Sequence, residues 1–228
     1  MRYLAIIFGL LTLGPGEAQL SNTTQTTDEN AAAISAGDAI VYQVIPAETE
    51  LRILVFRDGP LARLGHNHVI LAQQVSGSIA LRDPRDTSTF ELSLPVAALL
   101  VDTAQARDEE GPAFSSEPSA ADAARTRENM LGPRVLNQQR FPAIRITGGL
   151  TSSGESPSTQ VEIHFREGVT QKTVPINLIV TTDRLTISGN LAISHRELGL
   201  APFSVMMGAI RVADVINLRF EISAARQR

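Results

Sequence analysis

Residues 174–193 read VPINLIVTTDRLTISGNLAI, and this stretch decides the fold. Apolar side chains occupy every second position from Val174 to Val180. The same spacing, with one glycine in the row, runs from Leu185 to Ile193. Successive side chains of a β-strand point to opposite faces, so each half predicts a strand with one apolar face. The segment Thr182-Asp-Arg184 between them is typical of a turn.

The same alternation recurs along most of the chain from Ala39 onward, and it predicts about eight strands. The other apolar rows are Leu51, Ile53 and Val55; Val75, Gly77, Ile79 and Leu81; Phe90, Leu92 and Leu94; Ile144 and Ile146; Val161, Ile163 and Phe165; and Ile216, Leu218, Phe220 and Ile222. Strands that are apolar on one side only and are joined by short turns pair antiparallel. We therefore expect an all-β fold, an eight-stranded antiparallel lipocalin-like barrel with one inserted helix. A two-sheet sandwich is the alternative that this pattern leaves open.

One region departs from the two-residue period. Residues 102–118 are rich in acidic residues, Gly and Pro, and predict an exposed loop. Residues 119–131 are strong helix formers, with Ser119 as N-cap and Gly132-Pro133 as the stop. We expect this inserted helix to lie over one mouth of the barrel.

The N-terminal residues predict export. Residues 1–18 combine a positive start, an uncharged apolar run and small residues, which is the composition of a signal peptide. The apolar run holds about eleven residues, whereas a membrane-spanning helix needs ~20, so no stable membrane span is expected. We expect residues 19–38 to be a flexible segment and residues 39–226 to be the barrel domain. In a Gram-negative bacterium the destination would be the periplasm.

Composition narrows the function classes. The chain has no cysteine, so it forms no disulfide and has no thiolate chemistry. Its net charge is −4 and no basic run stands out, which argues against nucleic acid as a partner. No nucleophile motif and no phosphate-binding glycine loop is present, so we favour a binding protein over an enzyme.

Four short motifs resemble those of the YceI-like family of exported, lipocalin-like polyisoprenoid-binding proteins. They are Asn137-Gln-Gln-Arg-Phe-Pro142 with the strand Ala143-Ile-Arg-Ile146 after it, Ile45-Pro-Ala-Glu-Thr-Glu-Leu-Arg-Ile53, Leu185-Thr-Ile-Ser-Gly-Asn-Leu191, and Ile193-Ser-His-Arg-Glu-Leu-Gly199. The resemblance implies a barrel around an apolar tunnel for a long-chain isoprenoid, a quinone or another lipid. The chain also departs from the family pattern. His195 stands where the family has Arg, Arg127-Glu-Asn129 replaces an acidic–His pair, and Gly65-His-Asn-His68 has no counterpart.

The residues predicted to bind the ligand lie on the apolar faces, with one histidine at a strand end. They are Leu51, Ile53, Val75, Ile79, Phe90, Leu92, Val161, Ile163, Leu178, Leu191, Ile193 and His195. The same aliphatic residues would equally form a dry, packed core, and the sequence leaves both interpretations open.

The histidines give the alternative function. His66 and His68 are two residues apart, which in a strand places both side chains on one face. Together with His195 they would form a three-histidine zinc site with an open position, and hence a metal-binding protein or metal-dependent enzyme. The same histidines could instead bind the polar head of a ligand such as a quinone. The sequence also leaves the oligomeric state open, a homodimer included.

Overall fold

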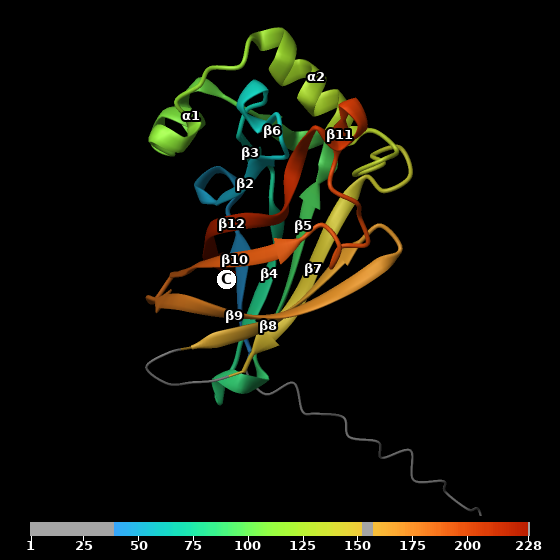
Figure 1. The fold of residues 1–228 in the computed structure, drawn as a ribbon. Coiled ribbons are helices and arrows are strands. Elements are labelled where there is room, and N and C mark those ends of the chain that lie inside the picture. Colours follow the sequence, from blue (N-terminus) through green and yellow to red (C-terminus); the bar gives the residue numbers. More distant parts are fainter. Residues whose placement is uncertain (1–38, 152–156, 228) are drawn as a thin grey trace, which may run out of the picture. The chain divides into compact units, whose positions relative to one another are not determined.

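The computed structural model describes residues 39–151 and 157–227, which form an antiparallel β-barrel. Figure 1 shows strands β8, β9 and β10 crossing in front of β4, β5 and β7, with helices α1 and α2 at one end. The strands are β1 Ile40–Val44, β2 Glu50–Asp58, β3 His68–Ala72, β4 Ser76–Leu81, β5 Thr89–Pro95, β6 Leu99–Val101, β7 Ala143–Leu150, β8 Ser158–Phe165, β9 Gly168–Val180, β10 Arg184–Ser194, β11 Ser204–Val205 and β12 Ile210–Arg226. The helices are α1 Ala104–Glu109 and α2 Ala120–Leu131.

Eight of these strands close on themselves, as the sequence predicted. Their order is β1-β4-β5-β7-β8-β9-β10-β12, and β12 pairs back to β1 through Val44 and Ala224. The remaining part of the sheet extends from β12 through β2 and β3 to β6. A short 3₁₀ turn separates β1 from β2 and another separates β5 from β6, so each pair is one interrupted strand. Closure of the ring excludes the two-sheet sandwich.

Helix α2 begins and ends where the sequence predicted. The Ser119 hydroxyl accepts a hydrogen bond from the Asp122 backbone N–H at 3.2 Å, and Gly132 caps the other end. Arg127 then fixes the helix to β6 by donating to the backbone carbonyls of Leu99 and Ala97. Because β6 is the last strand of its part of the sheet, the helix covers an edge that would otherwise be open.

The prediction of an exposed loop over residues 102–118 is wrong. The segment contains α1 and packs Ala106 and Phe114 against Val69, in a small core on the outer face of β2 and β3. The rings of Phe56 and Phe114 lie 5.5 Å apart. Two of the acidic residues that suggested exposure, Glu109 and Glu110, are paired with Arg52 on β2, which binds the Glu110 carboxylate at 3.1 Å. The sequence did not predict this packing because Ala106 and Phe114 stand singly among charged residues, without a repeating apolar spacing.

The barrel interior is divided into two halves by the size of its inward side chains. In one half Phe90 faces Gly148 and Phe220 faces Gly189 across paired strands. A Cβ at either glycine would come within 2.7 Å of the phenyl ring opposite, so the rings occupy the space that side chains would fill. The side chains around them are buried and packed together; they include Tyr42, Val75, Ile79, Val174, Leu185 and Ala224.

Candidate functional site: an apolar cavity with three histidines

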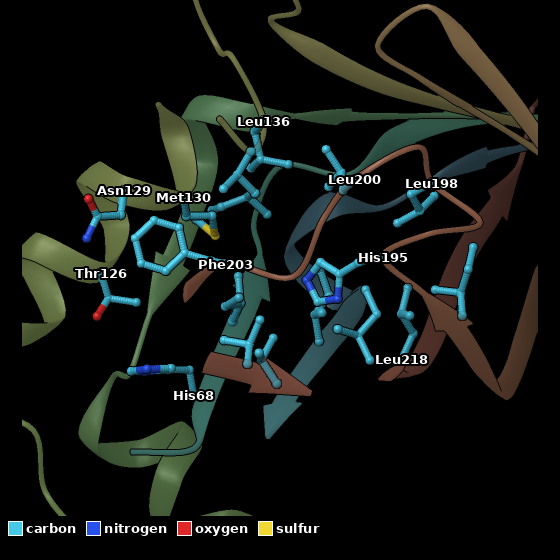
Figure 2. Close-up of a pocket in the computed structure, with 18 of the residues that line it drawn as sticks. His68, Thr126, Asn129, Met130, Leu136, His195, Leu198, Leu200, Phe203 and Leu218 are labelled. Carbon is cyan, nitrogen blue, oxygen red and sulfur yellow. The ribbon is translucent and has the colours of Figure 1, made fainter. Parts of the chain in front are cut away.

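The other half of the barrel contains a cavity of about 300 Å³. Its wall is formed by aliphatic side chains from nine strands, and helix α2 contributes Thr126, Asn129 and Met130. The aliphatic wall residues on strands are Leu51, Ile53, Val55, Ile70, Leu94, Leu99, Ile144, Ile146, Ile163, Ile193, Val205, Ile210, Val212, Ile216 and Leu218. Figure 2 shows Met130, Leu136 and Phe203 on one side of this space and Leu198, Leu200 and Leu218 on another. The expected position of the inserted helix over a mouth of the barrel is confirmed.

The cavity holds part of the predicted ligand-binding set. Leu51, Ile53, Ile163, Ile193 and His195 line it. Val75, Ile79, Leu92 and Val161 are instead buried in the packed half, and Phe90, Leu178 and Leu191 pack against the same core. All of them belong to the barrel core, but the structure brings only the first five together around open space. Their role in binding stays a prediction.

A buried polar cluster lies directly behind one wall of the cavity. The Asp102 carboxylate has no exposed surface, and its Oδ1 accepts hydrogen bonds from Arg107 at 2.6 Å and from the Val69 backbone at 3.0 Å. Its Oδ2 is 2.7 Å from Nδ1 of His68. Asp102 has a left-handed backbone (φ 54°), which short polar residues tolerate and which folds the carboxylate back over β3.

The cluster keeps Asp102 ionised. Burial by itself raises the pKa of a carboxyl group. Here the hydrogen bonds from His68, Val69 and Arg107 outweigh burial and hold the pKa of Asp102 below its usual range. Arg107 also donates to the backbone carbonyls of Asn67, Phe114 and Ser116. One guanidinium therefore joins the Gly65–His68 loop to the segment that follows β6.

His195 is another polar residue of the cavity wall and is 8% exposed. Its Nδ1 lies 2.8 Å from the backbone carbonyl of Asp214, which can only accept a hydrogen bond. Nδ1 of His195 is therefore protonated. The nearby Glu197 serves the turn and not the cavity, since it binds Lys172 and Ser194, and these contacts lower the pKa of Glu197 to about 2.

His66 also lines the cavity, and its Nδ1 is 3.3 Å from the Ser116 hydroxyl. The three histidines predicted to bind zinc thus border one space. In the part of the chain that the structure describes, however, no three His, Asp or Glu side chains are grouped closely enough to hold a metal ion. Each histidine instead has a polar partner of its own, and zinc binding stays a prediction without geometric support.

Sequence reasoning missed Asp102, Arg107 and Phe203. Asp102 directly follows the strand Leu99–Val101. The acidic residues after it led us to assign the whole stretch to an exposed loop, so Asp102 was not singled out. Phe203 lines the cavity and stacks against Arg134, whose guanidinium carbon lies 4.9 Å from the centroid of the Phe203 ring. Nothing in the local sequence marks this contact.

The fold has solved counterparts. Burkholderia cenocepacia BcnA aligns over 79% of this chain and 99% of its own, with 11% identity and a TM-score of 0.58. The Campylobacter jejuni YceI protein aligns over 70% of this chain and 85% of its own, with 10% identity and a TM-score of 0.50. A mutant CJ YceI protein solved with a monobromobimane guest gives a TM-score of 0.51 at the same identity.

The chain has a YceI-like fold. No protein-family model and no curated protein matches the sequence. At this level of identity the likeness shows the YceI-like architecture alone. Among the described residues, no helix is long and apolar enough to cross a membrane.

Replacing Arg107 by Met should destabilise the protein by about 3–5 kcal/mol at pH 7, because it leaves the Asp102 charge buried without its partner. The low pKa of Asp102 means that the ionised carboxylate contributes stability above about pH 4, the ordinary Asp range, and that this contribution is lost as pH falls further. The difference between the variant and wild type should therefore shrink near pH 3. Urea unfolding followed by circular dichroism at both pH values measures this difference in the free energy of unfolding.

Arg145→Met is the matched control. Arg145 pairs with Glu91 at 3.7 Å on the surface, where both side chains are more than half exposed, so the loss should be about 0–1 kcal/mol. Equal losses for the two variants, or a loss at Arg107 that does not change with pH, would contradict the ionic role of the cluster.

Proposed function

We propose that the protein binds an apolar, isoprenoid-type molecule inside its barrel. The observation that carries this proposal is the cavity itself, which is walled by aliphatic side chains and has few polar groups. An apolar wall with a small number of placed polar groups is the usual composition of a small-molecule site.

The cavity size sets a limit on what it encloses. A water molecule occupies about 30 Å³ of liquid, so 300 Å³ holds on the order of ten carbon-sized atoms. That is about two isoprene units, and a long chain would have to extend beyond the cavity. Burying ten carbons at ~0.8 kcal/mol each supplies on the order of 8 kcal/mol before the costs of association. The apolar wall is therefore sufficient to hold such a group without an ionic anchor.

Ile163 and Val161 provide a matched test because they lie two residues apart on the same face of β8. Ile163 lines the cavity, whereas Val161 belongs to the packed half. We expect Ile163→Trp to fill the cavity and abolish uptake of N-phenyl-1-naphthylamine and of added isoprenoid, while the protein stays folded. Val161→Trp should instead overfill the core and lower the free energy of unfolding by about 1–3 kcal/mol.

The dye is followed by fluorescence and unfolding by urea titration. The wild-type chain has no tryptophan, so neither variant perturbs an existing signal. Normal uptake by a folded Ile163→Trp variant would show that the ligand lies elsewhere. No uptake by the wild type, together with no lipid extracted from the purified protein, would overturn the proposed function.

We further propose that the protein works after export. The support is the signal-peptide composition of residues 1–18, which lie outside the residues that the structure describes, as do residues 19–38. Expression of the full chain in a Gram-negative host should give a periplasmic product whose N-terminus, read by Edman degradation, is close to Gln19. A cytoplasmic product that keeps Met1 would contradict export.

A further inference from the structure

Two of the three cavity histidines, His68 and His195, share one tautomer, and that tautomer determines which ligand head they accept. Nδ1 of His195 donates to the Asp214 carbonyl, and Nδ1 of His68 faces the ionised Asp102 carboxylate, which also can only accept. A neutral imidazole that donates from Nδ1 carries a lone pair on Nε2. Within residues 39–151 and 157–227, neither Nε2 atom has a hydrogen-bond partner. Each histidine therefore offers the cavity an unused acceptor.

The two Nε2 acceptors lie in an apolar environment, where an unpaired acceptor affects which ligand binds. His195 is more than nine-tenths buried, and the wall around both rings is largely aliphatic. Figure 2 places His68 on the side of Thr126 and Asn129, and His195 beside Leu218 and Leu198. An apolar ligand that covers these acceptors without supplying a donor incurs their desolvation cost, so a ligand that supplies a donor is favoured over one that does not.

On the basis of the proposed function, we infer that the cavity selects an isoprenoid whose head carries a hydroxyl group, an alcohol or a hydroquinone, over the carbonyl form of the same chain. The hydroxyl donates to Nε2 of His68 or His195. An aldehyde or quinone oxygen is itself only an acceptor, so it leaves these lone pairs unmatched. The buried Asp102–Arg107 pair is the device that fixes the His68 tautomer, and Asp102 is a positioning residue that does not line the cavity.

Asp102→Asn tests this mechanism with an isosteric change. The retained Oδ1 can still accept from Val69 and Arg107, while the new amide nitrogen faces Nδ1 of His68 and can only donate to it. The ring proton must then move to Nε2, which turns an acceptor for the ligand into a donor. The variant thus reverses the polarity of His68 without removing any side chain from the cavity wall.

The probes are geraniol, geranial and myrcene, which present a hydroxyl, an aldehyde and a plain hydrocarbon on chains of about the size that the cavity encloses. Affinities are measured by displacement of N-phenyl-1-naphthylamine at pH 8, above the range in which histidines ordinarily titrate. We expect wild-type protein to bind geraniol about three- to tenfold more tightly than geranial, the effect of one net hydrogen bond. Asp102→Asn should lower this ratio at least about threefold. Asp86→Asn, at an exposed carboxylate, should leave it unchanged.

The outcomes separate this inference from the proposed function. Equal binding of all three probes by the wild type would overturn the hydroxyl preference and leave the binding role intact. Binding of none would overturn both. Long-range ¹H–¹⁵N correlation spectra of the wild-type imidazoles at pH 8 report which ring nitrogen is protonated. This measurement does not depend on whether the Asn variant folds. Protonated Nδ1 in His68 and His195 supports the inference, and protonated Nε2 in both overturns it.

Discussion

Closure of the sheet through β12 is the constraint on which the rest of the structure depends. This strand pairs with all eleven residues of β10 along one edge, while its other edge pairs first with β2 and then with β1. A closed ring of eight strands fixes the interior width, so the size of the inward side chains alone decides whether a level is filled or hollow. Phe90 and Phe220 fill one half over glycines, and smaller aliphatic residues leave the other half open.

The hydrogen-bonding polarity of the hollow half is set by residues that pack on the outside of the barrel. The segment after β6 packs on the outer face of β2 and β3, and Arg107 holds it against the loop that leads to His68. The ionised Asp102 in this segment sets the proton position on an imidazole that borders the cavity. A buried ion pair that does not line the cavity thereby gives polarity to an apolar space, because it fixes the tautomer of one ring.

The sequence predicted the barrel well because strands buried on one face show a regular two-residue alternation of apolar and polar residues. The row from Leu185 to Ile193 faces the interior as its two-residue period requires, and Ser119 caps α2 by a local interaction that its own neighbours specify. It could not predict which inward residues would border a cavity. Val161 and Ile163 are alike in type and period, and they differ only because Val161 pairs with Gly148, beside Phe90, while Ile163 pairs with Ile146. The Asp102–Arg107 pair was missed because it joins residues whose surroundings come from distant strands.

In this structure one half of the barrel is an open apolar cavity and the other half is packed. Xenon binds apolar cavities and has little affinity for filled cores, so a crystal of the mature protein under xenon pressure tests the claim directly. The account predicts xenon density among Ile53, Ile163 and Leu218 and none between Phe90 and Phe220. Absence of xenon from the first position, or occupancy beside the two phenylalanines alone, would contradict it.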